Sequence, residues 1–392
     1  MEYTKLKNIN FYKSENINPS KYPNDVFEMY SVPIYETGHP EYLRGEEIAS
    51  SKSLVKKNDI LLCKINPRIN RVWIVKDESD KINIASSEWI VIRNDEYNPE
   101  FLAWYLRSPK FQKLMTSEVT GIGGSLTRAQ PKRVAEYPVP VLPLREQNEI
   151  ANVLNKAKRI IDNRKQELFM LDELIKARFI ELFGDPVNNS KAWNVKPLLE
   201  MGYCKNGMNF QTGDSGIEMH CLGVGDFNDY SIIDRTDHLP MISLNEEPSE
   251  ECMLQNGDIV FVRSNGNKNL VGRCVMVYPY DTPTTYSGFC IRYRLTGDEV
   301  IGPYLLHVLK MDSMRKKMAG RGANIQNLNQ QILASLDIPL PPIALQKQFA
   351  DFITKIDKSK LLEERQVRFI AKISQKPGRQ ISFCRFDRFD YN

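Results

Sequence analysis

The feature that most constrains the fold of this chain is an internal repeat whose two copies lie 199 residues apart. Asp59 in KNDILLCK matches Asp258 in NGDIVFVR, and Gln147 matches Gln346 at the same offset. The glycines of GIGGSL and GRGANI and the prolines of VPVLPLREQ and IPLPPIALQ keep this offset too. Such a repeat predicts two copies of one domain. The duplication either has no functional meaning or provides two domains for two parts of one target, as on a DNA duplex with two half-sites.

The two copies match less closely between and before these segments. SEWI at 87–90 aligns with SGFC at 287–290, which pairs Trp89 with Phe289. The stretches that precede the two matching aspartates look unlike each other. Each copy is therefore expected to have a variable front half and a more constant back half.

Each copy is predicted to be an α+β globule of about 150 residues. A helix is expected from Pro99, capped by Asn98, and Pro109 should break or kink it. Its counterpart is expected to begin at Gly302 and Pro303. Strands are expected over 59–63, 71–75, 82–84 and 89–93 in the first copy and over 258–262, 273–278 and 289–295 in the second.

A long helix is predicted after each proline-rich strip, because apolar residues recur there with the alternating 4–3 spacing of a coiled coil. Gly184 is expected to end the first helix, and a weaker second seam runs from Phe349 to Ile370. We expect the two helices to pair antiparallel, with a globule at each end; alternatively, each helix packs on its own domain. The first seam consists of Ile150, Leu154, Ala157, Ile161, Arg164, Leu168, Leu171, Ile175, Arg178 and Leu182.

These patterns predict the order of domains along the chain. A helix of roughly 35 residues spans about 50 Å, which is more than one turn of DNA. The expected organisation is a globular domain over 1–145, a central helix over 146–183, a linker over 184–193, a second globular domain over 194–344, a C-terminal helix over 345–374 and a tail over 375–392.

Composition and absent motifs narrow the function. A net charge of +4 permits nucleic-acid binding without requiring it. Seven cysteines and four histidines form neither C-x-x-C nor H-E-x-x-H, which argues against a disulfide framework and a zinc site. Neither a long apolar run nor a signal peptide is recognisable, so we expect a cytoplasmic protein without a membrane span. Phosphate-loop, dinucleotide, [DNS]-P-P-[YF] and G-x-S-x-G motifs are also absent, so catalytic residues, metals and cofactors are not expected.

Two loops combine basic and amide side chains at equivalent places in the two copies, in CKINPRINRVW and VRSNGNKNLVGR. Arginine and asparagine can contact base edges, and lysine and arginine neutralise phosphates, although a basic loop is otherwise an ordinary solvated surface. The strips GIGGSLTR and GRGANIQN either approach phosphates or are plain turns. The candidate DNA-binding residues are Lys64, Asn66, Arg68, Asn70, Arg71, Arg128, Arg263, Asn265, Asn267, Lys268, Arg273, Arg321 and Asn324.

The duplicated layout, the P-L-P-x-x-E-Q-like strips before long helices and F-G-D-P after the first helix resemble the specificity subunits of type I restriction–modification enzymes. The strings SVPIYETGHPEYLRGEEIASSK, KNDILLCKINPRINRVWIV, NGDIVFVRSNGNKNLVGR and IPLPPIALQKQFADFI extend the likeness over nearly the whole chain. The resemblance implies a non-catalytic subunit whose two target-recognition domains each read one half of a bipartite site in double-stranded DNA. It also implies a helical pair that sets the spacer and docks two modification subunits.

The same resemblance assigns the chemistry to other chains. It implies that S-adenosylmethionine, ATP and magnesium act on the partner modification and restriction subunits. From the residues alone, two alternatives stay open. One is a stand-alone DNA-binding regulator with tandem domains, and the other is a nuclease built on scattered acidic residues.

Overall fold

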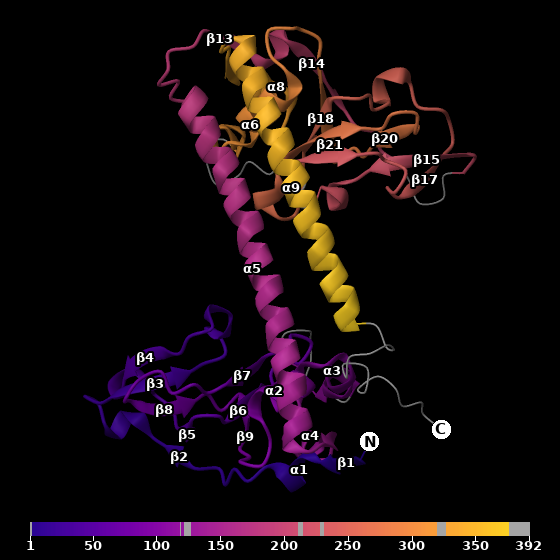
Figure 1. Ribbon diagram of the computed structural model, residues 1–392. Coiled ribbons are helices and arrows are strands. Elements are labelled where there is room, and N and C mark those ends of the chain that lie inside the picture. The colour runs from indigo at the N-terminus through magenta and orange to yellow at the C-terminus, as the bar shows by residue number, and fades with distance from the viewer. Residues whose placement is uncertain are drawn as a thin grey trace. The chain divides into compact units, whose positions relative to one another are not determined.

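The computed structural model describes residues 2–117, 119–120, 127–210, 215–227, 231–319 and 327–375. The chain divides into two compact units, and the division falls between Arg164 and Lys165 of the long helix α5 Leu144–Phe183 and again between Arg365 and Gln366. In Figure 1 the strands of the first unit run from indigo to purple, and those of the second run from pink to orange. Each unit mixes strands with short helices, which agrees with the α+β class predicted for both copies.

The first domain has a five-stranded sheet in the order β2-β5-β8-β3-β4 and a three-stranded sheet in the order β7-β6-β9. Its first strand pairs antiparallel with its last, β1 with β12, so the two ends of the domain lie together. Its elements are β1 Glu2–Lys5, α1 Leu6–Ile9, β2 Asn16–Ile17, β3 Val26–Tyr30, β4 Glu41–Arg44, β5 Lys52–Leu54, β6 Ile60–Cys63, β7 Val72–Ile74, β8 Ile82–Ala85, β9 Trp89–Ile92, α2 Pro99–Arg107, α3 Pro109–Ser117, β10 Val119–Thr120, β11 Arg128–Ala129, α4 Pro131–Val134 and β12 Pro138–Val141.

The second domain has a five-stranded sheet in the order β14-β21-β18-β19-β16 and a three-stranded sheet in the order β17-β15-β20. Its ends are also closed by an antiparallel pair, β13 with β22. Its elements are β13 Val195–Pro197, β14 Gly202–Asn206, β15 Ile217–Leu222, β16 Ile232–Asp234, β17 Met241–Leu244, β18 Asp258–Val262, β19 Cys274–Tyr278, β20 Thr284–Tyr286, β21 Cys290–Leu295, α6 Gly302–Lys310, α7 Asp312–Ala319, α8 Gln330–Ala334 and β22 Asp337–Pro339, followed by the helix α9 Ile343–Gln375.

The repeated core of each domain is one strand buried on both faces. Ile60 of β6 packs in the cluster that contains α2, whereas the next residue, Leu61, packs in the cluster on the other face. Ile259 and Val260 of β18 divide in the same way between two clusters. Burial on both faces explains the unbroken apolar runs in ILLC and DIVFV, because only a strand with one solvated face alternates with polar residues.

A buried ion pair recurs in the same place in both domains. Arg93 at the end of β9 binds Asp59 through Nε and Nη2, at 2.8 and 2.7 Å. Arg294 of β21 binds Asp258 through the same two atoms, both at 2.8 Å. The two aspartates identified by the repeat are therefore the acceptors of two equivalent bidentate pairs.

The repeated glutamines have an equally specific role. Gln147 Oε1 accepts a hydrogen bond from the backbone N–H of Asn98 (2.9 Å), and Gln346 Oε1 accepts one from Ile301 (2.9 Å). Each amide nitrogen donates at 2.8 Å to a carbonyl in its own proline-rich strip. Both glutamines thus tie the start of a long helix to the N-cap of a shorter one.

The front halves of the two domains share a pairing pattern that their sequences do not reveal. β3 pairs parallel with β8 and antiparallel with β4, while β15 pairs parallel with β20 and antiparallel with β17. The domains differ in the further strands, which are β2 and β5 in the first and β14 and β16 in the second. The front halves are therefore more alike in fold than expected, since backbone hydrogen bonds set the pairing whatever the side chains are.

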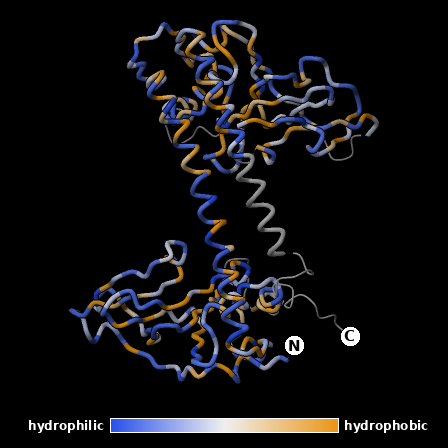
Figure 2. The backbone as a smooth tube through the Cα atoms, in the orientation of Figure 1, coloured by the Kyte–Doolittle hydropathy of each residue, from blue (hydrophilic) through white to orange (hydrophobic). Residues whose placement is uncertain are grey.

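Two predicted helix features can be compared with the structure. The helix expected from Pro99 is interrupted at Ser108 and continues as α3, because Pro109 provides no N–H for the helix ladder. The long helix α5 begins at Leu144, two residues before the predicted start, and Gly184 follows it with a left-handed φ of +75°. In Figure 2 the middle of α5 is predominantly hydrophilic.

Within the second unit, the end of α5 packs against both α9 and the globular core. Phe349 of α9 contacts the rings of Phe179 and Phe183, and Lys360 binds Asp172, so the two helices run antiparallel there. Within this unit the helices therefore pair and α9 also packs on its own domain, whereas the end of α5 packs on the second domain rather than on its own. The most deeply buried residues at this end of α5 are Ile175, Phe179 and Phe183. The predicted seam instead continued from Ile175 to Arg178 and Leu182, which are only half-buried. The buried face differs because a globule covers a wider stripe of a helix than one partner helix does.

Candidate nucleic-acid interface

In the first domain, three chain segments meet where β6 ends. The N–H of Lys64 donates to the carbonyl of Glu88 just before β9 (3.0 Å), and Ala129 of β11 donates to the carbonyl of Lys64 (2.9 Å). An isolated antiparallel bridge joins Ile65 to Arg128. We call this junction the three-segment edge of the first domain.

The second domain has an equivalent three-segment edge. The N–H of Arg263 donates to the carbonyl of Phe289 (2.8 Å), and Leu328 donates to the carbonyl of Arg263 (2.7 Å). The isolated bridge joins Ser264 to Asn327. The same backbone hydrogen bonds therefore organise both edges, and the strip after each glycine-rich segment supplies the third strand.

The predicted loop of the first domain is a turn with one exposed cation at its tip. Asn66 adopts a left-handed φ of +45°, and its carbonyl accepts from the N–H of Ile69 (3.0 Å). Asparagine tolerates this conformation better than most residues do. Arg68 is exposed, whereas Asn70 is half-buried and donates to the carbonyl of Arg107 at 2.9 Å. Arg68 is therefore accessible at the surface, and Asn70 anchors the loop.

The other two candidates in this loop point elsewhere. Lys64 lines a hollow of about 290 Å³ together with Lys7 and Tyr12. Arg71 lies half-buried near Cys63, where burial raises the pKa of the thiol and Arg71 partly offsets the rise. The three cations of this loop therefore lie apart, with Arg68 at the exposed tip, Lys64 in a neighbouring hollow and Arg71 half-buried near Cys63.

In the second domain, Arg263 and the asparagines hold the loop together. Arg263 Nη1 donates to the carbonyl of Gly288 (3.2 Å). Asn265 Oδ1 accepts from the N–H of Asn267 (2.8 Å), and Asn267 Oδ1 accepts from the N–H of Asn269 (3.1 Å). These side chains shape the loop, and of the candidate residues here Asn265 also lines the pocket at the edge.

Four candidates remain, and the structure places the side chain of one of them, Arg273. Arg273 lines a different hollow, with Lys310 of α6, so the structure does not bring it together with Asn265. Lys268 begins the 3₁₀ turn η7 Lys268–Leu270. Arg321 and Asn324 lie outside the described residues.

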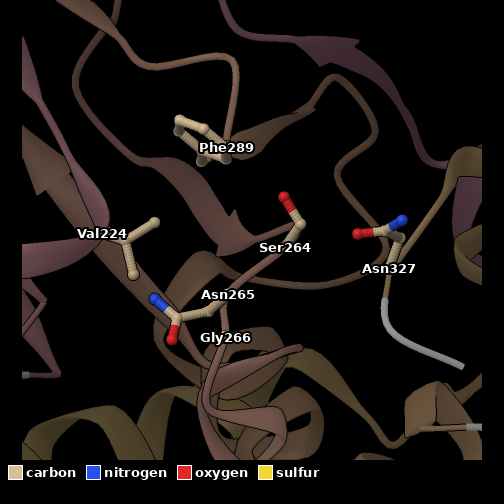
Figure 3. A pocket seen from close by; sticks show the side chains of 6 residues that line it. All are labelled: Val224, Ser264, Asn265, Gly266, Phe289 and Asn327. Atoms are coloured by element: carbon tan, nitrogen blue, oxygen red, sulfur yellow. The ribbon is translucent and has the colours of Figure 1, made fainter.

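The edge of the second domain opens into a pocket of about 460 Å³. Figure 3 shows its lining side chains, among them Phe289 and Asn327 from separate loops with Ser264 between them. Phe289 is 62% exposed, the highest value among the large hydrophobic side chains described between β13 and β22. The lining residues are Val224, Ser264, Asn265, Gly266, Phe289 and Asn327.

The sequence comparison of the two copies is wrong by one residue at Phe289. The strand registers pair Cys63 with Trp89 and Val262 with Cys290, so Cys290 is the equivalent of Trp89. Trp89 is only 4% exposed. A shift of one residue moves a side chain to the opposite face of a strand, so Phe289 was aligned with a core residue although it faces solvent. An alignment of the two copies by their paired strands places Phe289 opposite Glu88 instead of Trp89.

The position equivalent to Phe289 in the first domain is Glu88, which the sequence reading also missed. Arg128 binds Glu88 through Nε and Nη2, at 3.3 and 3.1 Å, with the two side chains 47% and 28% exposed. This hydrogen-bonded carboxylate raises the pKa of Arg128. Arg128 corresponds to Asn327, so the two edges carry a charged pair in one domain and an aromatic–amide pair in the other.

The edges offer hydrogen-bond donors, acceptors and an aromatic ring, which suit recognition of base edges. Among the described residues, no group of three or more His, Cys, Asp and Glu side chains is placed to hold a metal ion. No helix in the described part of the chain is long and apolar enough to cross a membrane.

Comparison with known families gives a match for most of the chain. Residues 3–170 and 193–368 match the type I restriction modification DNA specificity domain. The StySPI specificity subunit of a type I restriction enzyme from Salmonella potsdam is 23% identical over 280 residues, which are 67% of this chain and 58% of that subunit. The match therefore covers less than two thirds of that relative. The MjaVIII specificity subunit from Methanocaldococcus jannaschii is 22% identical over 86% of this chain and 82% of its own.

Solved structures show the same fold. The S subunit of the type I restriction–modification system from M. genitalium superimposes with a TM-score of 0.54 at 14% identity, covering 95% of this chain and 93% of that one. A chain from a study of complex assembly and conformational transition of the type I R-M system also gives a TM-score of 0.54, at 16% identity and 95% coverage of both chains.

Proposed function

Because the chain belongs to the family of type I restriction modification DNA specificity domains, we propose that it is the DNA-recognition subunit of a type I restriction–modification enzyme. The observation that carries the proposal is the duplicated three-segment edge, with the same backbone hydrogen bonds in both domains. Each domain reads one half of a bipartite site in double-stranded DNA. The long helices α5 and α9 set the length of the spacer between the halves.

The subunit itself is non-catalytic in this proposal. Two modification subunits transfer the methyl group from S-adenosylmethionine, and restriction subunits use ATP and magnesium to cleave. This chain supplies sequence recognition through its domains and a docking surface through its helices.

An exposed apolar strip on α5 supports the docking role. Phe169 is 64% exposed, and Met170, Leu174 and Ile180 are also exposed. Beside this strip is a hollow of about 380 Å³, which is lined in part by Phe169 and Asp172. These apolar side chains lie outside the buried face of α5 that holds Ile175 and Phe179, and exposed apolar side chains gathered in this way mark a surface that another protein covers.

The test is to map methylated bases by single-molecule sequencing in cells that carry this gene with its neighbouring genes. We expect one bipartite methylated motif that disappears when this gene alone is deleted and returns when the gene is restored. A methylome that is the same with and without the gene would contradict the proposal. Tight binding of the isolated chain to one operator, with no effect on methylation, would identify a stand-alone regulator instead.

A further inference from the structure

The two three-segment edges share a backbone but differ in side-chain chemistry. The first domain presents the ion pair of Glu88 and Arg128, whereas the second presents Phe289 and Asn327, which carry no charge. The backbone hydrogen bonds that position these residues are the same in both domains. Equivalent side chains therefore leave the edge from equivalent places, and only their chemistry differs.

We propose that this pair of positions determines base-pair specificity in both domains, with the first domain reading a G·C pair and the second an A·T pair. The proposal rests on the DNA-binding function proposed above and adds the residues and the base pair. It assigns a role to Glu88 and Phe289, two residues that a search for basic and amide side chains would not select.

Asn327 suits adenine in the second domain. Its side chain is exposed and makes no hydrogen bond within the part of the chain that the structure describes. A carboxamide has one acceptor and two donors, so it can accept from N6 of adenine and donate to N7. Asn265 is less suitable, because its Oδ1 already accepts from the N–H of Asn267.

Phe289 suits the thymine of the same pair. The ring lines the same pocket as Asn327, with Ser264 between the two side chains, and it has no polar atom to match a base edge (Figure 3). In the major groove, the C5 methyl group of thymine is the apolar feature that such a ring can contact. Cytosine would place its N4 amino group against the ring, where it would lose hydrogen bonds to water without replacement. The two side chains therefore favour the two bases of one A·T pair.

Glu88 and Arg128 suit a G·C pair in the first domain. A guanidinium can donate to both O6 and N7 of guanine, and a carboxylate can accept from N4 of cytosine. The ion pair keeps both groups together at the edge before DNA arrives. Against an A·T pair, the carboxylate would face the O4 and methyl group of thymine, neither of which can donate a hydrogen bond. The charged pair thus discriminates against A·T.

The experiment exchanges the two chemistries. The full chain is co-expressed with its modification subunits in cells that lack the gene, and methylated motifs are mapped by single-molecule sequencing. The variant Phe289→Glu with Asn327→Arg should change one position of one half-site from A·T to G·C. The reciprocal variant Glu88→Phe with Arg128→Asn should change one position of the other half-site from G·C to A·T. Met241→Glu, at an exposed apolar residue on β17, is the matched control and should leave both half-sites unchanged.

A single substitution guards against misfolding of the exchange variants. Asn327→Ala removes only an exposed amide, so the complex should assemble normally, and discrimination at that one position should fall roughly 5- to 150-fold. Loss of selectivity at both half-sites, or an assembled Asn327→Ala complex with an unchanged motif, would overturn the inference. If the unmodified chain produces no bipartite motif at all, the function proposed above fails instead, so the two failures are distinguishable.

Discussion

Replacing Asp258 by asparagine should destabilise the second domain strongly while leaving the first intact. Asp258 is 1% exposed and is bound by Arg294 through Nε and Nη2, both at 2.8 Å. Its Oδ2 also accepts from the N–H of Gln255 (2.7 Å). Asparagine keeps the shape of the side chain but removes the charge and points an amide donor at the guanidinium. Arg294, only 14% exposed, is then a nearly buried cation without a counter-ion.

Removing one partner of a buried ion pair costs about 3–5 kcal/mol. For a unit of this size, each kcal/mol lowers the melting temperature by about 2–4 °C, so the transition of the second domain should fall by at least about 6 °C. The assay is differential scanning calorimetry of the purified chain, with urea unfolding as a second measure. The matched variant Asp59→Asn removes the equivalent acceptor of Arg93 and should shift the transition of the first domain instead.

A double substitution separates the ion pair from simple packing. Replacing both Asp258 and Arg294 by uncharged residues of similar volume, as in Asp258→Asn with Arg294→Met, should recover much of the loss, because no unpaired charge is left buried. The reasoning would be refuted if Asp258→Asn lowered the unfolding free energy by less than about 1 kcal/mol, the ordinary range of an exposed pair.

Three further results are expected. Burial lowers the pKa of His307 to about 4 from its ordinary value near 6.5, so the unfolded state takes up the proton first as pH falls. The free energy of unfolding of the second domain should therefore fall by up to about 3 kcal/mol between pH 6.5 and pH 4. Calorimetry of His307→Gln should show a flatter dependence of stability on pH, and an unchanged dependence would contradict this. Phe169→Glu should change the free energy of unfolding by no more than about 0.5 kcal/mol but weaken binding to the modification subunits at least about tenfold in co-purification. Gln166→Glu, at an exposed neighbouring residue, should leave this binding unchanged. Equal binding by both variants would exclude the α5 strip as a docking surface. Arg68→Ala should reduce the slope of log affinity for DNA against log salt by about 0.9, while Arg68→Lys should preserve it; an unchanged slope would place Arg68 away from the phosphates.

Much of the back half of each domain could be predicted from the sequence because its signals are local. The apolar runs around β6 and β18, the proline break at Ser108 and the left-handed glycine after α5 depend on residues that are neighbours in the chain. The front halves were harder to predict, because their strands are short and several pair with partners distant in the sequence. The parallel pairing of β3 with β8 and of β15 with β20 leaves no turn between them to recognise.

The candidate site was predicted only in part, for a similar reason. Arg68, Arg128 and Asn265 lie at or near the edges, but Arg273 faces another hollow. Basic and amide residues are easy to find in a sequence, whereas the face to which each points depends on the register of strands far apart in the chain. Phe289 and Glu88 were missed because an aromatic or acidic residue gives no signal for DNA binding by itself.

The sequence by itself determined that the chain contains one domain twice, since an offset of 199 residues recurs in segments that fold alike. It also identified Asp59 and Asp258 as equivalent, because the two residues occupy the same place in matching strings at that offset. Only the tertiary structure decided what stands opposite each of them and which side chains share an edge. The physical reason is that strand register and side-chain direction come from hydrogen bonds between distant segments, and one residue of slip exchanges the buried face for the exposed one.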